Sequence, residues 1–330
     1  MRRRSSILGT DIAVDLGTAN TVVYVRGVGI VLEEPSVVAL RTRDRRLLAV
    51  GTEAERMVGR TPPHIATIRP LAEGVVADLD ACESMLRAFI QLVSQRRWVK
   101  PRMVMCVPSG VTSVEQRAVM EVAEAAGARK PVHVIEEPLA AAIGAGLPVH
   151  RPAGNMIVDI GGGTTEIAVV SLGGIVTSRS IRVGGRAMDE ALISFVKTEY
   201  GITLGERSAE QHKIRFASAW PSQEDDYVDL AGSELGTGLP KMVTASSGEL
   251  GEAIDAPLGD IADAIRVALD ETPPELVAEI MQDGVVITGG GALLSGIAPR
   301  LGADVGIPFF VADDPLHSVA IGAGLYLEGL

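Results

Sequence analysis

Short apolar runs alternate with segments of helical periodicity along most of the chain. Residues 79–93 place apolar side chains at helical spacing, and residues 188–200 do the same before Gly201, which stands where a helix ends. Between them, residues 103–107 form an apolar run closed by Pro108, as expected for a buried strand. Strands that alternate with helices in this way predict an α/β architecture.

Capping and proline signals mark further helix starts. Ser113 and Gln116 have the spacing of a capping box, which predicts a helix of about twelve residues from this point. Residues 272–275 read Thr-Pro-Pro-Glu, and proline fits the first helical position. The stretch 205–255 is rich in Gly, Ser, Glu and Asp. We expect this stretch to form the surface of an inserted subdomain.

Two predicted hairpins share one pattern, in which a strand runs into an aspartate and a Gly-rich turn. The first reads VDLGTANT at 14–21, and the second reads VDIGGGTTE at 158–166. Two copies of one pattern predict two related α/β halves that face each other across a cleft.

The first Gly-rich turn has the residue types that a bound phosphate chain needs. Asp15 stands at the end of a strand, and Gly17 allows backbone N–H groups to approach a ligand. Thr18, Asn20 and Thr21 add hydroxyl and amide donors. Oriented N–H groups bind phosphate, and a nearby carboxylate holds Mg²⁺ through water. The alternative is a plain tight hairpin with an aspartate-capped turn.

The second turn is the more specific of the two. Asp159 precedes three consecutive glycines at 161–163, which are followed by Thr164. Glycines inside a hairpin cost backbone entropy and pack nothing, and close contact with phosphate explains that cost. A third cluster, 289–291, follows an apolar run and fits against a base and ribose, although strand–Gly–helix junctions are common.

Two adjacent acids precede a predicted helix. Glu136 and Glu137 stand before Pro138, which fits the first turn of a helix. One interpretation is that they only complement the helix dipole. The other is that one carboxylate orients the water that attacks a γ-phosphate. Near the C-terminus, residues 320–324 are small, which favours close helix packing.

Composition narrows the class of protein. The chain is 47% hydrophobic with a net charge of −12, and this acidic balance argues against broad nucleic-acid binding. Cys82 and Cys106 are far apart with no CxxC or Cys/His cluster around them, which predicts reduced thiols rather than a metal site. We expect no signal peptide, and no apolar run approaches the ~18 residues of a membrane span.

Five elements in one order resemble the ATPase superfamily of actin, the sugar kinases and the heat-shock chaperones. They are similar to the phosphate-1 loop, the first connecting helix, the phosphate-2 loop, the adenosine loop and the second connecting helix, at 15–21, 136–146, 159–165, 289–291 and 320–324. Longer stretches, among them IRPLAEGVVADLD, IEEPLAAAIGAGLPV and DIGGGTTEIAVVSLGGIV, are similar to the MreB/Mbl type of bacterial actin homologue.

The resemblance implies an actin-like, two-lobed ATPase fold with a central nucleotide cleft. Its halves are duplicated ribonuclease-H-like units, and each half carries two subdomains. The expected subdomains are IA at 8–32 and 71–147, IB at 33–70, IIA at 148–182 and 253–330, and IIB at 183–252.

The resemblance also implies ATP and Mg²⁺ as cofactors and a role for each motif residue. Phosphate is expected on Gly17, Thr18, Ala19, Asn20, Gly161, Gly162, Gly163 and Thr164. Hydrated Mg²⁺ is expected on Asp15 and Asp159, and Glu137 is expected to position the attacking water, with Glu136 as the alternative. Ribose and adenine are expected to contact Gly185, Asp189, Glu210, Lys213, Gly289, Gly290, Gly291 and Ala292.

The family function that follows is a slow ATPase that assembles head-to-tail into filaments. We expect a cytoplasmic, peripherally membrane-associated protein that organises cell shape or cell-wall synthesis with membrane proteins of the wall machinery, and no nucleic-acid partner. Trp98 and Val99, flanked by Arg96, Arg97 and Lys100, match the family's apolar loop that enters the inner leaflet. The alternative is that Trp98 folds back onto its own domain.

The sequence departs from the family pattern at two places, and two other functions of the same fold are alternatives to this interpretation. The short basic N-terminus has no convincing amphipathic helix, and LAGSEL at 230–235 stands where an Arg-Asp pair is expected. A chaperone-type ATPase of the same fold needs a substrate-binding domain after the ATPase. A small-molecule kinase needs a base for the acceptor hydroxyl, and the sequence presents none outside the phosphate motifs.

Overall fold

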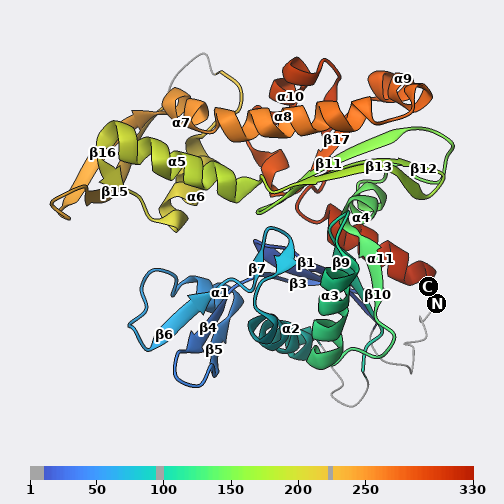
Figure 1. Cartoon of the computed structure of the whole chain (residues 1–330), viewed down its shortest axis with the longest axis horizontal. Coiled ribbons are helices and arrows are strands. Elements are labelled where there is room, and N and C mark those ends of the chain that lie inside the picture. The colour runs from blue at the N-terminus through green and yellow to red at the C-terminus, as the bar shows by residue number, and fades with distance from the viewer. Residues whose placement is uncertain (1–10, 94–99, 222–225) are drawn as a thin grey trace. The chain divides into compact units, whose positions relative to one another are not determined.

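A computed structural model describes residues 11–93, 100–221 and 226–330 of the chain. The chain divides into two compact units. The first contains Met1–Pro148 and His317–Leu330, and the second contains Val149–Leu316 (Figure 1).

The main sheet of the first unit has five strands in the order β10-β9-β1-β2-β3. The strands β1 and β2 form the predicted antiparallel hairpin, and β3 continues it antiparallel to β2. The strand β9 runs parallel to both β1 and β10. These strands span Ile12–Leu16 (β1), Asn20–Val25 (β2), Gly29–Pro35 (β3), Met103–Val107 (β9) and His133–Glu136 (β10).

Helices cover this sheet because many of its side chains are apolar and buried, as in β9, where all five are. The helices α2 (Leu79–Val93) and α3 (Ser113–Ala126) pack against each other, and their buried side chains share one core with Ile12, Val14 and Leu16 of β1. The helix α11 (Ser318–Gly329) contacts β1, β2 and β9, and packs along α4 (Glu137–Gly144).

A smaller part of the first unit follows β3. It contains a three-stranded sheet in the order β5-β4-β6, a short helix α1 and a two-stranded hairpin of β7 and β8. The bounds are Val38–Arg41 (β4), Leu47–Val50 (β5), Gly51–Glu55 (α1), Ile65–Ile68 (β6), Leu71–Ala72 (β7) and Val75–Val76 (β8).

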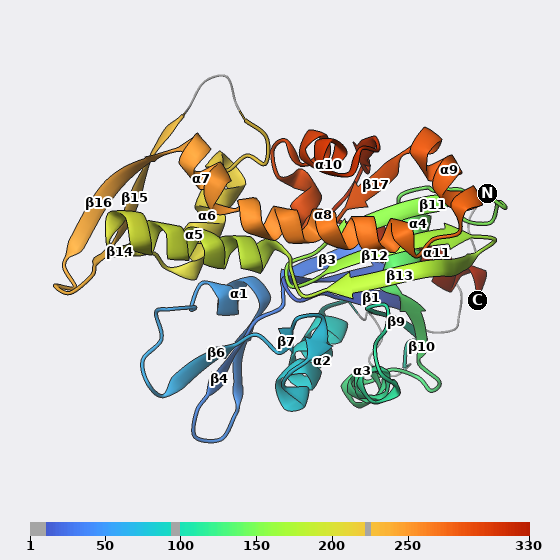
Figure 2. The ribbon, with the colours of Figure 1, turned by 45° about the horizontal axis from the view of Figure 1, so that its top comes forward.

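The main sheet of the second unit has the order β13-β12-β11-β17-β18. The helix α8 runs along β12 and β13 of this sheet (Figure 2). The elements are Asn155–Ile160 (β11), Thr165–Ser171 (β12), Gly174–Ile181 (β13), Val285–Thr288 (β17), Phe309–Val311 (β18), Gly185–Tyr200 (α5), Asp255–Asp270 (α8), Pro274–Asp283 (α9), Gly290–Leu293 (η1, a 3₁₀ helix) and Ile297–Val305 (α10).

The polar stretch 205–255 builds most of a second, three-stranded sheet of this unit and its helices. The sheet order is β14-β15-β16. The bounds are Ile202–Thr203 (β14), Glu206–Phe216 (α6), Tyr227–Glu234 (β15), Pro240–Ser246 (β16) and Ser247–Ala253 (α7).

The two main sheets repeat one strand arrangement. In each, three consecutive strands are joined antiparallel, and two later strands are added parallel to the first of them. The predicted duplication of an α/β half is therefore confirmed. The further division of each half into two subdomains stays a prediction.

Two sequence expectations need correction. The capping box of α3 is made by Thr112 and Glu115, one residue before the predicted pair, because the Thr112 side chain accepts the Glu115 N–H. Residues 317–330 belong to the first unit, although 253–330 were expected to lie together in the second half.

The reason for the second difference is the close contact of α11 with α4. A Cβ on Gly144 would lie 1.8 Å from the Ser318 carbonyl oxygen, and one on Gly322 would lie 1.8 Å from that of Ala140. Only glycine allows two helix backbones this close. The small residues at 320–324 do produce the close helix packing that the sequence predicts.

Candidate functional site

The first Gly-rich loop joins β1 to β2, and its shape depends on glycine. A Cβ on Gly17 would lie 2.7 Å from the Asn20 carbonyl oxygen, so a larger residue does not fit this turn. Thr18 is buried, and its Oγ1 accepts a hydrogen bond of 3.1 Å from the Gly74 N–H in the turn between β7 and β8. That contact fixes the Thr18 side chain.

Asp15 stands one residue before the end of β1. The surrounding protein withdraws water from its carboxylate and raises the pKa of Asp15 to about 7. A bound cation reverses such a shift because it favours the charged carboxylate. Asp15 is therefore suited to a site that also supplies positive charge.

The two adjacent acids lie at the same edge of the sheet as Asp15. Glu136 is the last residue of β10, and Glu137 is the first residue of α4. The strands β1 and β10 both run parallel to β9, with Val14 opposite Met105 and Ile135 opposite Cys106. The carboxyl ends of β1 and β10 thus meet at one edge, which is where α/β proteins place their ligands.

The predicted helix start at Pro138 is confirmed. Pro138 lies in the first turn of α4, where its missing N–H costs no hydrogen bond. Glu136 is exposed and Glu137 is half-buried. Both carboxylates lie at the amino end of α4, where negative charge interacts favourably with the helix dipole.

The second Gly-rich loop joins β11 to β12 in the second unit. Gly161 donates its N–H to the Thr164 carbonyl oxygen at 2.9 Å, which closes the turn. The first N–H groups of α5 donate hydrogen bonds to the carbonyl groups of this loop. Gly185 donates to Gly161 O and Arg186 donates to Gly162 O, both at 2.9 Å.

The third glycine cluster packs against the end of β11. Gly289 has φ +80°, and a Cβ there would lie 2.3 Å from Asp159 Oδ1. A Cβ on Gly291 would lie 2.2 Å from the Ile160 side chain. Residues 290–293 form η1, with Ala292 buried. The structure therefore brings this cluster to the second loop, although the two are far apart in sequence.

Three polar side chains gather at α5 and α6. Lys213 Nζ lies 2.8 Å from Asp189 Oδ1 and donates to the Gly185 carbonyl oxygen, also at 2.8 Å. Burial raises the pKa of Asp189 to about 6 despite the favourable Lys213 charge, and the nearby Glu210 charge adds to the rise. The four residues predicted at 185, 189, 210 and 213 thus form one cluster.

Two residues that hold the first loop were not predicted. The buried Ser36 donates its hydroxyl to the Gly17 carbonyl oxygen at 2.6 Å, and Gly74 donates to Thr18. Thr21 was expected to offer a donor to the ligand, but it is buried and its hydroxyl pairs with that of Ser36 at 2.9 Å. No local sequence signal marks these contacts.

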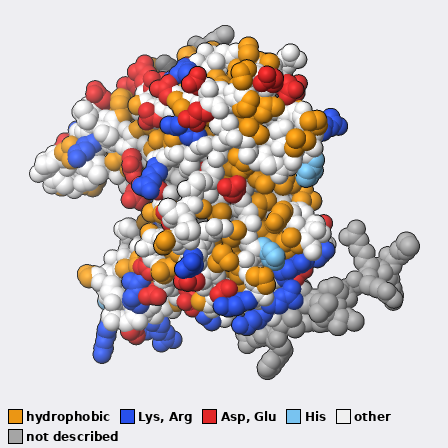
Figure 3. All heavy atoms as spheres, turned by 45° about the vertical axis from the view of Figure 1, so that its right-hand side comes forward, with side chains coloured by type: hydrophobic (Ala, Val, Ile, Leu, Met, Phe, Trp, Pro, Cys, Tyr) orange, Lys and Arg blue, Asp and Glu red, His pale blue; other side chains and the backbone are white. Residues whose placement is uncertain are grey.

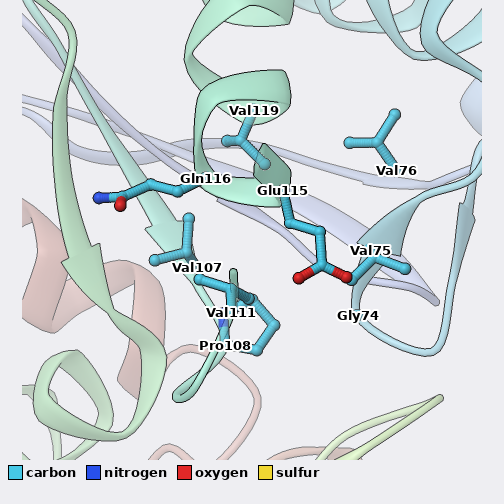
Figure 4. A pocket seen from close by; sticks show the side chains of 9 residues that line it. All are labelled: Gly74, Val75, Val76, Val107, Pro108, Val111, Glu115, Gln116 and Val119. Carbon is cyan, nitrogen blue, oxygen red and sulfur yellow. The ribbon is translucent and has the colours of Figure 1, made fainter. Parts of the chain in front are cut away.

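A small apolar pocket lies behind the turn that contacts Thr18. Figure 4 shows the side chains that line it, and valines predominate. An apolar lining does not fit phosphate, so this pocket does not belong to the phosphate loops. Its residues are Gly74, Val75, Val76, Val107, Pro108, Val111, Glu115, Gln116 and Val119.

Within the described ranges, no group of three or more His, Cys, Asp or Glu side chains is arranged to hold a metal ion. Magnesium at nucleotide sites usually takes one or two carboxylates together with water and phosphate oxygens. Asp15 and Asp159 are each a single carboxylate of the kind that such a site uses. Each stands one residue before the end of the strand that enters a Gly-rich loop.

Three basic side chains of the first unit lie at or near the end of the connection that leads into β9. Lys100, Arg129 and Lys130 are exposed, and Arg129 donates its N–H to the Pro101 carbonyl oxygen at 2.8 Å. Figure 3 shows a band of Lys and Arg side chains along the lower edge of that view. Trp98 and Val99 lie outside the described residues. No described helix has the length and apolar character needed to cross a membrane.

The chain is similar over nearly its whole length to bacterial cell-shape proteins. It is 49% identical to the cell shape-determining protein MreB of Escherichia coli strain K12, over 99% of this chain and 96% of that protein. It is 48% identical to the cell shape-determining protein Mbl of Bacillus subtilis strain 168, over 97% of this chain and 96% of that protein.

Solved structures agree with this similarity. MreB5 of Spiroplasma citri bound to ADP matches with a TM-score of 0.93 and 35% identity, covering 97% of each chain. The MamK double helical filament has the same fold, with a TM-score of 0.83 over 97% of this chain and 99% of that chain at 22% identity. The expected actin-like fold is therefore confirmed.

The family model described as MreB/Mbl protein matches residues 9–330. Together with the two duplicated sheets and their Gly-rich loops, this match shows that the chain belongs to the MreB/Mbl family of actin-like ATPases.

Proposed function

We propose that this protein binds ATP with Mg²⁺, hydrolyses it slowly, and couples that cycle to assembly into cytoskeletal filaments. The observation that carries the proposal is the duplicated loop. In both units, an aspartate one residue from a strand end precedes a Gly-rich turn whose carbonyl groups are held from behind. Relatives of the family are known with AMPPNP and with ADP.

The phosphate chain is held by the N–H groups of both loops. In the first loop these belong to residues 17–20, and in the second to residues 161–164. The carbonyl groups of these loops accept hydrogen bonds from the rest of their own unit. The C=O and N–H of one trans peptide point in opposite directions, so the N–H groups are left to point toward a ligand. Asp15 and Asp159 hold hydrated Mg²⁺, which neutralises charge on the phosphates.

Glu137 positions the water that attacks the γ-phosphate. It begins α4 at the edge of the sheet where β1 ends, and it is less exposed than Glu136. Phosphoryl transfer needs an in-line water more than a strong base. Glu136, at the end of β10, is the alternative in that role.

The ribose and adenine are bound by the second unit. The Lys213 ammonium holds Asp189 and the carbonyl group of Gly185, so both are fixed before a nucleotide arrives. Glu210 completes this cluster, and Gly289, Gly290, Gly291 and Ala292 supply the backbone surface for the base. Small residues suit that surface because a flat base then lies against the chain.

Assembly is head-to-tail, with a second copy of the chain as the partner. Such a heterologous contact does not close and yields an open filament. Bound nucleotide biases the conformation that makes this contact. The MamK structure of the same fold is a double helical filament. A small-molecule kinase and a chaperone-type ATPase are not favoured by the matched relatives, which are cell shape-determining proteins.

The filament acts at the inner leaflet of the cytoplasmic membrane, with membrane proteins of the cell-wall machinery as further partners. Lys100 follows Trp98 and Val99 in the sequence, and the exposed Arg129 and Lys130 lie near Pro101, to which Arg129 donates its N–H. Each basic residue near an anionic leaflet contributes about 1 kcal/mol, and a filament repeats the contact. The double change Trp98→Ala with Val99→Ala is expected to lower co-sedimentation with anionic vesicles and to leave ATP hydrolysis intact.

Light scattering tests the assembly part of this proposal. The purified protein is titrated across its concentration with Mg·ATP or with Mg·ADP, at several salt concentrations. The expected result is a critical concentration that depends on the bound nucleotide. A protein that stays monomeric with ATP under all these conditions contradicts the proposal.

A further inference from the structure

Ser36 lies where β3 ends and the smaller sheet of the first unit begins. It follows Pro35, the last residue of β3, and precedes β4, which starts at Val38. Its side chain is fully buried. A buried serine needs partners for its hydroxyl, and the partners show which part of the molecule it serves.

The three hydrogen bonds that Ser36 makes through its N–H and its hydroxyl all reach the first Gly-rich loop. Its N–H donates to the Ala19 carbonyl oxygen at 2.8 Å, and its Oγ lies 2.6 Å from the Gly17 carbonyl oxygen. Its Oγ also lies 2.9 Å from Thr21 Oγ1. One residue therefore contacts the loop at its start, middle and end.

The directions of these hydrogen bonds follow from the number of hydrogens. A carbonyl oxygen only accepts, so the single hydroxyl hydrogen of Ser36 goes to Gly17. Thr21 must then donate its own hydrogen to Ser36 Oγ. The result is a directed chain from Thr21 through Ser36 to Gly17, in which each bond polarises and strengthens the next.

This series of hydrogen bonds from Thr21 to Gly17 fixes the direction of one backbone N–H group. The Gly17 carbonyl and the Thr18 N–H belong to one planar trans peptide, so they point in opposite directions. The Gly17 carbonyl points toward the Ser36 hydroxyl, and the Thr18 N–H therefore points away from Ser36. Glycine restricts its own backbone little, so the orientation of this peptide depends on such an outside contact.

We propose that Ser36 is a positioning residue for phosphate binding. It holds the Gly17–Thr18 peptide so that the Thr18 N–H is ready for the nucleotide phosphates, and Thr21 supports it through the hydroxyl chain. This inference rests on the proposed function, in which residues 17–20 bind phosphate. A merely structural serine would affect stability and would not distinguish a phosphorylated ligand from one without phosphate.

The test compares ADP with adenosine, because adenosine lacks the phosphates and keeps the base and ribose. Dissociation constants are measured by calorimetry, or by competition where binding is weak, for wild type and Ser36→Ala. We expect Ser36→Ala to weaken ADP binding by about tenfold, which corresponds to about 1.4 kcal/mol and the loss of one well-placed hydrogen bond. Adenosine binding is expected to stay within about twofold of wild type.

Three further variants complete the test. Two change Thr21, the partner of Ser36, and the third is a control for loss of stability. Thr21→Val removes the donor to Ser36 and is expected to show a smaller ADP-specific loss of about threefold, and Thr21→Ser is expected to behave as wild type. Thr272→Val removes a buried hydroxyl that donates to the Ala268 carbonyl oxygen in the second unit, and is expected to lower the melting temperature with unchanged ADP affinity. If Ser36→Ala does not fold, Thr21→Val and Thr21→Ser carry the same comparison.

The outcomes separate the two proposals. An ADP-specific loss in Ser36→Ala, with the graded effect at Thr21, supports the positioning role. An unchanged ADP constant, or equal losses for ADP and adenosine, overturns that role and leaves the proposed function standing. A wild-type protein that binds ADP no more tightly than adenosine overturns both.

Discussion

The two Gly-rich loops have the same strands around them and are held by different groups. In the first loop, the Ser36 side chain donates its hydroxyl to the Gly17 carbonyl oxygen and accepts one from Thr21, in addition to the backbone bond from the Ser36 N–H to Ala19. Behind the second loop, backbone N–H groups at the start of α5 bind Gly161 and Gly162. A duplicated scaffold therefore does not imply duplicated contacts.

The threonine after each loop shows the same divergence. Thr21 and Thr165 are equivalent, since each lies opposite the last residue of the preceding strand. Thr21 pairs with the Ser36 hydroxyl, and Thr165 donates to the Val183 carbonyl oxygen at 2.7 Å. One hydroxyl is kept in place by a side chain and the other by backbone. The first loop should therefore be easier to alter by substitution.

The units also differ in the chemistry beside the loop. The first has carboxylates at the amino end of α4, and the second has the Lys213–Asp189 cluster.

Glu137→Ala is expected to lower single-turnover phosphate release by about 10²-fold or more, because the attacking water loses its positioning group. ATP affinity is expected to change little. Release at the wild-type rate would move this role away from Glu137.

The second loop is expected to respond strongly to a change at Gly184. A Cβ at this position would lie 2.6 Å from the Gly161 carbonyl oxygen, which is backbone and cannot move aside easily. Gly184→Ala is expected to weaken ADP binding by tenfold or more, since such overpacking costs about 1–3 kcal/mol.

Gly205→Ala is the matched control for that change. Gly205 also precedes a helix, and a Cβ there meets nothing within 4 Å. Its ADP affinity is expected to equal that of wild type. Equal effects of the two substitutions would show that helix propensity, and not the loop contact, is responsible.

Asp189 gives the second unit a dependence on pH. Its pKa in the folded protein is raised to about 6 from 3.8, so the folded state binds a proton more tightly than the unfolded chain. This contribution to stability is complete below pH 3.8 and is lost as the pH rises through about 6.

The expected result is a pH-dependent difference between wild type and Asp189→Asn. From pH 7.5 to pH 5, wild type should gain about 1 kcal/mol in the free energy of unfolding relative to the variant. Urea unfolding at both pH values measures this difference. If wild type instead lost stability relative to the variant over this range, the Lys213 charge would outweigh burial in its effect on the pKa of Asp189.

Membrane attraction is expected from basic side chains of the first unit, with an effect as small as that of Asp189. Lys130→Gln should lower affinity for anionic vesicles about fivefold, which corresponds to about 1 kcal/mol for one basic residue. Lys197→Gln, at an exposed lysine in the last turn of α5, is expected to have no effect. Equal losses would indicate a general charge effect.

The sequence predicts the parts that depend on local pattern. The hairpins at both loops follow from β-branched runs around an Asp-x-Gly turn, and Gly201 ends α5 in the left-handed conformation as expected. The cluster at 185, 189, 210 and 213 came from the family resemblance, and the structure brings those residues together.

The parts that were missed depend on contacts between distant segments. Ser36 and Gly74 reach the first loop only after β3, β7 and β8 are in place, and no spacing rule marks them. The small residues at 320–324 predict close packing without naming the partner, so α11 was assigned to the wrong half. Thr112 and Ser113 are both acceptable caps, and only geometry chooses Thr112.

The most direct measurement of the central claim is the Mg²⁺ dependence of ADP and ATP binding in wild type, Asp15→Asn and Asp159→Asn. We expect each loop to contribute one metal-holding carboxylate. Calorimetry should therefore show each variant losing more affinity for the Mg²⁺-bound nucleotide than for the metal-free nucleotide. Equal losses with and without Mg²⁺, or a loss in only one variant, would contradict the claim that both loops hold the same metal-bound nucleotide.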